Sequence, residues 1–330
     1  MQLSSTQCPC ALSSSSGVVP QEIHWRHGRW FASKQGPYQF PIDAEERDRL
    51  DKLNQFFLLA RGYNAFSCPV RRGNPANPTR VLDLGAGTGI WAIQVAEEFL
   101  PESQVVAVDL NRIQPAFIPE NLRIIPLDIE KDDWVPPPTD DRGPFPTDCD
   151  LVHMRLLLGS LHSESWPAVY QKAYNHTAPG GYFEQIELDW EPRWEGQRPK
   201  NSALLEWSHK FLEGMDRFRC SARMNSKMVE HMVTAGYEEF EETVIRCCVN
   251  PWCDDGDEKR VAEWFNLCLM ESIEAMGLAP LVEHHGMTVY QVRELQERVM
   301  DEICRLQYHA YFNMHVWTAR RPIKGADETI

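Results

Sequence analysis

The sequence has few basic residues and no long uncharged apolar segment. Lys and Arg together number 33 against 48 Asp and Glu, which gives a formal net charge of −15. Because phosphate groups are bound mainly by Lys and Arg, this balance argues against direct binding of nucleic acid and against attraction to an anionic membrane. No apolar run approaches the roughly 20 residues that a membrane-spanning helix needs. We therefore expect a protein that binds neither nucleic acid nor membrane directly.

The ten cysteines lack the spacings of a disulfide framework and of a zinc site. No Cys-x-x-Cys pair occurs, so no metal site is predicted. The N-terminus has neither the basic segment nor the apolar core of a signal peptide. Scattered free thiols then indicate a reducing compartment, and we expect a protein that is neither secreted nor held in a membrane.

The N-terminal region is predicted to contain three parts. Residues 1–22 are rich in Ser and predict a disordered tail. Residues 23–67 predict an irregular arm and then a helix, with Asp43 as N-cap and Glu46 at the capping-box position. Gly62 is a natural C-terminal stop for this helix. We predict that the arm and helix form a lid that closes over a ligand.

A different pattern occupies residues 68–330, which are predicted to form one domain. Short apolar β-type segments alternate with helical stretches in its first half, which is typical of a parallel, doubly wound sheet. Residues 135–146 predict a surface loop because prolines crowd this segment. Helical insertions are predicted at about 191–222 and 256–307. The predicted strands are Arg80–Leu84, Gln104–Leu110, Leu122–Leu127, Cys149–Met154, Gly180–Trp190, Glu238–Val249 and Tyr311–Ala319.

The strongest local signal is VLDLGAGTG, in which the first strand leads into three glycines at alternate positions. Glycine has no Cβ, so the backbone can turn sharply and a ligand can approach closely. A dinucleotide fingerprint has the spacing G-x-G-x-x-G, whereas here the third glycine comes one residue early. This spacing favours a nucleoside ligand without a pyrophosphate over the alternative, an NAD-dependent oxidoreductase. The candidate binding residues are Asp83, Gly85, Ala86, Gly87, Thr88 and Gly89.

Acidic residues follow the second and third strands. Asp109 lies 22 residues beyond the middle glycine, where a carboxylate can accept two hydrogen bonds from a ribose diol. Asp128 ends the third strand, where it can accept from an adenine amino group. Leu110 and Ile129 follow these two carboxylates and are further candidates. Because ligands bind outside the carboxyl ends of parallel strands, we expect all these residues to share one site.

These motifs resemble those of class I S-adenosylmethionine-dependent methyltransferases. LDLGAGTG resembles the first motif of that superfamily, AVD the second, PLD the third, DLVHMR the fourth and PGGYFEQIE the fifth. Longer segments, among them YQFPIDAEERDRLD, PGGYFEQIELDWEPR, NPWCDD and ESIEAMGLAP, are similar to the fungal LaeA family of methyltransferase-like regulators of secondary metabolism. The resemblance covers residues from about 27 to 322.

The resemblance implies an α/β, Rossmann-like fold with S-adenosylmethionine as cofactor. The expected sheet has seven mostly parallel strands, the last of them antiparallel, with helices on both faces. The resemblance also implies a nuclear regulator that works with velvet-type partner proteins. Members of the family also occur as tailoring enzymes, which would act on a small-molecule acceptor in the cytoplasm. A cofactor-binding module without transfer activity is the third alternative, and the sequence leaves all three open.

Candidate catalytic residues lie on the fourth and fifth strands. An oxygen acceptor must lose a proton, and histidine is the usual base. His153 is the candidate for this role and also a candidate for cofactor binding, since it lies at the tip of the fourth strand. Glu187 on the fifth strand is a candidate for orienting an amine. The acceptor group, an oxygen, a nitrogen or a protein side chain, stays open at this point.

Overall fold

The apolar segments predicted from the sequence form one sheet in the computed structural model, which describes residues 22–32, 38–134 and 145–323. Its strands are β3 (Thr79–Leu84), β4 (Ser103–Asp109), β5 (Leu122–Pro126), β6 (Cys149–Arg155), β7 (Thr177–Trp194), β8 (Glu238–Cys248) and β9 (Ala310–Arg320). Their order is β5-β4-β3-β6-β7-β9-β8. The pairs from β5 to β7 are parallel, and β9 runs antiparallel to both of its neighbours. The predicted seven-stranded, mostly parallel sheet is therefore confirmed.

Helices cover both faces of this sheet, as predicted. They are α1 (Ala44–Ala60), α2 (Ile90–Gln94), α3 (Trp166–His176), α4 (Ala203–Arg217), α5 (Met228–Ala235), α6 (Gly256–His285) and α7 (Val289–Ile303), with a π-helical turn, η1 (Val95–Phe99), directly after α2. On one face α3 and α5 pack against Leu82, Val106 and Val152. On the other face α2 and η1 pack against Val81 and Val105. The neighbouring apolar residues of each central strand are thus buried on opposite faces, which explains why consecutive apolar residues occur in these strands.

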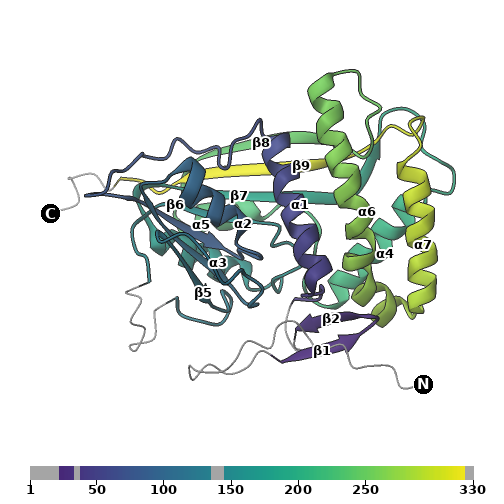
Figure 1. The fold of residues 1–330 in the computed structure, drawn as a ribbon, viewed down its shortest axis with the longest axis horizontal. Helices are drawn as coiled ribbons and strands as arrows, with labels where there is room; N and C mark the ends of the chain where they lie inside the picture. The colour runs from purple at the N-terminus through teal and green to yellow at the C-terminus, as the bar shows by residue number, and fades with distance from the viewer. Residues whose placement is uncertain (1–21, 33–37, 135–144, 324–330) are drawn as a thin grey trace.

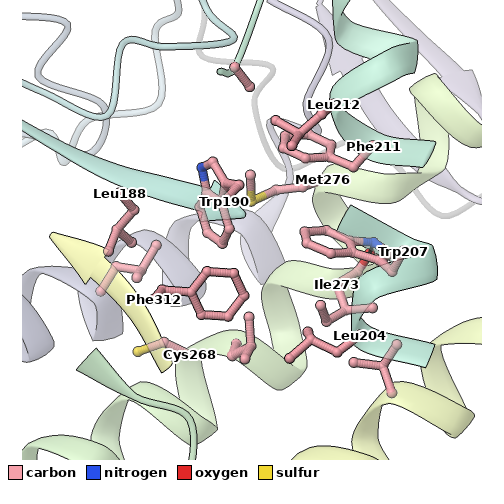
Figure 2. Packing of buried hydrophobic residues seen from close by; sticks show 14 of the residues in the cluster. Leu188, Trp190, Leu204, Trp207, Phe211, Leu212, Cys268, Ile273, Met276 and Phe312 are labelled. Atoms are coloured by element: carbon pink, nitrogen blue, oxygen red, sulfur yellow. Dashed lines mark hydrogen bonds between the residues drawn. The ribbon is translucent and has the colours of Figure 1, made fainter. Parts of the chain in front are cut away.

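Helices α1, α4, α6 and α7 form a second core around the ends of β7 and β9 (Figure 1). In Figure 2, Trp190 of β7 and Phe312 of β9 lie between the strands and the aromatic side chains of α4. The rings of Trp207 and Phe211 stack with their centroids 5.1 Å apart, and Trp190 meets Trp207 edge-on at 6.1 Å. These aromatic side chains of the first insertion are therefore buried in the core.

Helix α6 is the one helix in the described part of the chain that has the length and composition to cross a membrane. About two thirds of its apolar window, 67%, is buried inside the structure. By this test alone a span is weakly supported, because a buried core helix has the same length and composition. The sequence prediction concerned uninterrupted apolar runs, and α6 has none of spanning length because Glu271 and Glu274 interrupt it.

The N-terminal arm is more regular than predicted. Strands β1 (Ile23–Arg26) and β2 (Arg29–Ala32) pair as an antiparallel hairpin. His27 and Gly28 form its two-residue turn with φ of 56° and 85°, the positive values that tight hairpins require. The sequence prediction of an irregular arm missed this turn because His-Gly is an uncommon turn pair.

Helix α1 begins as predicted, with one difference at its cap. The Asp43 carboxylate accepts from the backbone N–H of Glu46 at 3.1 Å, and Gly62 follows the helix in a left-handed conformation. The Glu46 side chain does not return to the cap. It is buried and pairs with Arg49, whose guanidinium also donates to Ser272 of α6.

Two sequence predictions fall on segments outside the described residues. The predicted tail, residues 1–22, overlaps the described chain only at its last residue, and the predicted loop at 135–146 overlaps it only at 145–146.

Candidate functional site

A cavity opens where β3, β4, β5 and β6 end, at the edge of the sheet where parallel α/β folds bind ligands. It contains about 1030 Å³ of space, part of which is open solvent. Helix α1 forms the opposite wall through Leu50, Leu53 and Phe57, and Tyr38 adds to it. The structure brings nearly all of the predicted ligand residues to this one cavity: Asp83, Gly85, Ala86, Gly87, Thr88, Asp109, Leu110, Asp128, Ile129 and His153. Gly89 and Glu187 are not among its lining residues.

The loop after β3 needs its glycines for backbone conformation and for space. Gly85, Gly87 and Gly89 have φ of 71°, 57° and 79°. A Cβ on Gly85 would lie 2.4 Å from a Leu157 methyl carbon, so the Leu157 side chain would have to move to admit it. A Cβ on Gly87 would be 3.5 Å from Leu50 of α1 and would stand in the cavity. The loop thereby leaves open the space that a ligand needs between the sheet and α1.

Asp109 ties the glycine loop to the end of β4. One carboxylate oxygen accepts from the backbone N–H of Gly87 and the other from that of Asn111, both at 2.7 Å. Burial raises the pKa of Asp109 to about 6, and these two hydrogen bonds oppose the rise. A carboxylate has about four acceptor positions, so this one keeps capacity for further donors. Sequence reasoning expected only the ligand contact and missed the structural one.

Asp83 and His153 form a buried pair in the floor of the cavity. They lie side by side in the register of β3 and β6, and Oδ1 of Asp83 is 2.8 Å from Nδ1 of His153. The imidazole ring stacks on Trp91 with centroids 3.7 Å apart. Burial lowers the pKa of His153, although Asp83 opposes this effect, so the ring is neutral near pH 7. With the proton on Nδ1, Nε2 is an acceptor, and in the described structure it is buried without a partner.

Arg155, for which sequence reasoning proposed no role, contributes a positive charge to the same cavity. Its guanidinium donates to Oδ1 of Asn54 at 3.0 Å and lies 4.6 Å above the Phe57 ring. Burial lowers its pKa to about 10, so the group stays charged at neutral pH. A basic residue at the tip of the fourth strand was the only signal available in the sequence.

Asp128 and Ile129 form the far end of the cavity, beside β5. One Asp128 oxygen accepts from the N–H of Glu130 at 3.0 Å, and the other pairs with Lys131 at 2.9 Å. Glu130 in turn accepts from the backbone N–H of His162 at 2.7 Å. Asp128 therefore stabilises its own turn in addition to lining the cavity.

Glu187 lies apart from the cavity, buried under the segment that follows β6. Its carboxylate accepts from the backbone N–H groups of Leu157 and Leu158 at 3.1 and 3.3 Å and from the Gln185 amide at 3.0 Å. Burial raises the pKa of Glu187 to about 7. The structure thus places it where it positions a wall of the cavity, since Leu157 is a lining residue.

Side-chain hydrogen bonds join helix α1 to the glycine loop and to α2. Thr88 donates to Asp51 at 2.6 Å, and Asn54 donates to Gln94 of α2 at 2.6 Å. Phe56 and Phe57 of the same helix are fully buried in the core. The helix predicted to be a lid is thus a packed wall of the cavity in this structure.

In the described residues no group of three or more His, Cys, Asp or Glu is arranged to hold a metal ion.

Distant structural likenesses accompany this fold. The phosphoethanolamine N-methyltransferase 2 of Haemonchus contortus, solved with S-adenosyl-L-methionine, shares 16% identity and a TM-score of 0.45, over 83% of this chain and 52% of that one. The cyclopropane synthase MmaA2 of Mycobacterium tuberculosis shares 13% identity and a TM-score of 0.45, over 82% and 84%. Similarity at this level carries no information about ligand or activity.

Sequence comparison gives much closer relatives. The family described as "Methyltransferase domain" matches residues 47–233. The secondary metabolism regulator laeA of Fusarium oxysporum is 48% identical over 94% of this chain and 96% of its own length. The regulator LAE1 of Gibberella fujikuroi is 47% identical over the same shares, and laeA of Aspergillus fumigatus is 34% identical over 95% of this chain and 81% of its own. The resemblance found in the motifs is confirmed, and the chain belongs to the methyltransferase-domain family and, within it, to the fungal secondary metabolism regulators of the LaeA and LAE1 type.

Proposed function

We propose that this protein binds S-adenosylmethionine in the cavity at the ends of β3 to β6 and transfers its methyl group. The observation that carries the proposal is the Gly87–Asp109 arrangement. Gly87 keeps its side-chain space open toward the cavity, and Asp109 presents a carboxylate at the end of β4. A bound sulfonium cofactor supplies an activated methyl group, so the protein has to supply binding, orientation and a place for the proton.

The residues present fit such a nucleoside cofactor. Asp109 is the proposed acceptor for the ribose hydroxyls, because two backbone N–H groups hold it in place and leave it acceptor capacity. Leu110 and Ile129 are the proposed apolar neighbours of the base, and Asp128 is the proposed partner of its amino group. Asp83 is the proposed partner for a cationic group, since it lies in the floor of the cavity.

His153 is the proposed base for an oxygen acceptor. Its ring is neutral near pH 7, Asp83 holds one ring nitrogen, and the other has no partner in the described structure. Only 1% of the residue is exposed, so a proton can reach it only from inside the cavity. Glu187 is the second candidate, and its contacts support a positioning role on the segment after β6 instead of direct contact with an acceptor amine.

The biological part of the proposal is regulation of secondary metabolism through protein partners, with the velvet-type proteins as candidates and the nucleus as the site of action. Family membership supports it, since the relatives with the highest identities reported above carry the name of secondary metabolism regulator. The alternative is a tailoring enzyme in the cytoplasm, which would bind a small-molecule acceptor in the same cavity.

A label-transfer assay tests the activity and separates these alternatives. The purified full-length chain is incubated with S-adenosylmethionine labelled in its methyl group, once with cell-extract protein and once with extracted small metabolites. Label in protein supports the regulator, and label in the metabolite fraction supports the tailoring enzyme. Cofactor binding without label in either fraction would contradict transfer and leave a binding module. The variant Asp109→Ala is the matched control for cofactor-dependent labelling.

A further inference from the structure

The indole ring of Trp91 covers one face of the His153 imidazole. The two ring centroids lie 3.7 Å apart and the ring planes differ by 6°, so the rings stack face to face. Trp91 is the second residue of α2, directly after the glycine loop, and both rings are buried where they line the cavity. Asp83 lies beside His153 on the neighbouring strand, with its carboxylate 2.8 Å from Nδ1. Nε2 is then the ring nitrogen that has no partner among the described residues.

The orientation of Trp91 is fixed by a segment distant in the sequence. Its Nε1 donates to the backbone carbonyl of Ala65 at 2.9 Å, and this carbonyl also accepts from Arg61 at 3.0 Å. Arg61 forms an ion pair with Glu184, a buried carboxylate that lies next to His153 in the register of β6 and β7. Groups outside the stack therefore anchor the indole, and the imidazole packs against a fixed surface.

A stacked indole favours the charged form of the imidazole over the neutral form. The face of an indole ring is electron-rich and attracts a cation, most strongly where water is excluded. Burial lowers the pKa of His153 and so disfavours the charged form. The carboxylates of Asp83 and Glu184 favour the charge, whereas Arg155 on the same strand opposes it. Arg61 weakens the effect of Glu184, because the two side chains form an ion pair.

We propose that Trp91 is a positioning residue: it holds the His153 ring in place and stabilises the positive charge that the ring gains when Nε2 accepts a proton. This inference rests on the proposed function, in which His153 is the base. The acceptor hydroxyl gives its proton to Nε2 while its oxygen forms a bond to the methyl carbon, and the electrons of the broken carbon–sulfur bond stay on sulfur. The positive charge thereby passes from the sulfonium group to the imidazole, where Asp83 and the Trp91 ring stabilise it.

Titration of His153 by nuclear magnetic resonance tests this stabilisation in the absence of any ligand. The full-length chain is prepared with isotope-labelled histidine, and His153→Gln assigns the signal. For Trp91→Leu we expect the midpoint of the His153 titration to fall by about one pH unit, the size that a buried cation–π contact supplies. Trp91→Phe keeps a weaker ring face and should lie between. The control Trp252→Leu removes an indole stacked on His309 with centroids 4.3 Å apart, and it should leave the His153 titration unchanged.

The pH dependence of methyl transfer is the second readout. Single-turnover label transfer is measured with saturating cofactor, and the acidic limb of its pH profile reports protonation of the base. In Trp91→Leu the midpoint of this limb should move to lower pH by the same amount as the His153 titration. A merely structural role of Trp91 would lower the rate without moving the midpoint, and that result would contradict the inference.

The outcomes keep this inference apart from the proposed function. Label transfer together with equal His153 midpoints in the wild type and Trp91→Leu overturns the inference and leaves transfer in place. A shifted midpoint in a chain that transfers no label supports the stabilisation by Trp91 and refutes transfer. A ring that stays neutral at every pH at which the wild type is folded overturns the inference, because it never holds the charge. If thermal melts show that Trp91→Leu unfolds, Trp91→Phe decides, and an unchanged His153 midpoint there overturns the inference.

Discussion

Replacing Asp109 by Ala removes the carboxylate that serves both the ligand and the glycine loop. The proposed hydrogen bonds to ribose involve a charged acceptor, and such a bond contributes about 1.5–3 kcal/mol, which corresponds to a tenfold to hundredfold change in affinity. The variant also leaves the backbone N–H of Gly87 without its acceptor, since the carboxylate oxygen that lies 2.7 Å from it is gone. We therefore expect S-adenosylmethionine to bind at least tenfold more weakly to Asp109→Ala.

The pH dependence of binding is a second readout of the same residue. The pKa of Asp109 is raised to about 6, so the carboxylate is mostly protonated at pH 5 and mostly ionised at pH 7. If the ionised form is the one that accepts from ribose, affinity rises about tenfold between these two pH values. Asp109→Asn carries no titrating group at this position and should lose that rise.

Isothermal titration calorimetry at pH 5 and pH 7, with thermal melts in parallel, measures both effects. The control is Asp301→Asn, which alters an exposed carboxylate on α7 that pairs only with Arg305 in the described structure. Unchanged affinity in a folded Asp109→Ala variant would refute the assignment of the ribose site. A pH dependence that persists in Asp109→Asn would show that another group controls binding.

Three further predictions follow from the cavity and its walls. Gly87→Val should abolish binding of S-adenosylhomocysteine in calorimetry and be more severe than Asp109→Ala, because a branched side chain at φ 57° is strained and fills the cavity. The control for backbone strain alone is Gly196→Val, where φ is 90° and an added Cβ would have nothing within 4 Å. An equal loss of binding in both variants would contradict the steric argument. Burial raises the pKa of Glu187 from an ordinary 4.5 to about 7, so the folded state binds the Glu187 proton more tightly than the unfolded state does. The protonated carboxyl therefore contributes fully to stability below about pH 4.5, and this contribution is lost as the pH rises through 7. Urea unfolding should show that the wild type loses about 3 kcal/mol more than Glu187→Gln between pH 4.5 and pH 7.5, and identical losses would disprove the role of this carboxyl. Deletion of residues 1–62 should unfold the protein because it removes core side chains such as Phe57. Deletion of residues 1–22 should leave the melting temperature unchanged. A 1–62 deletion that stays folded and loses only cofactor affinity would restore the lid hypothesis.

The strands and the glycine loop were predictable because their signals are local. A short apolar segment between polar turns specifies a buried strand wherever it sits in the sheet, and six of the seven strand predictions match the structure within two residues at each end. The exception, β7, begins three residues earlier and continues four residues further than predicted. The turn at Gly85, Gly87 and Gly89 was predictable for a similar local reason, because glycine has no Cβ and adopts positive φ without strain. Asp109 and Asp128 could be assigned to one cavity because parallel strands end at the same edge.

The contacts between side chains were decided by the tertiary structure alone. The Asp83–His153 pair depends on the register of β3 against β6, and nothing in either segment specifies that the two strands are neighbours. Glu187 was a candidate for orienting an amine, and in the structure its carboxylate accepts hydrogen bonds from the backbone of Leu157 and Leu158 in the segment after β6. Within the described residues Arg155 has no carboxylate at ion-pair distance, because the nearby Asp83 pairs with His153 and Glu184 pairs with Arg61. Sequence pattern determines which residues reach the edge of the sheet, whereas packing between distant segments determines which of them meet.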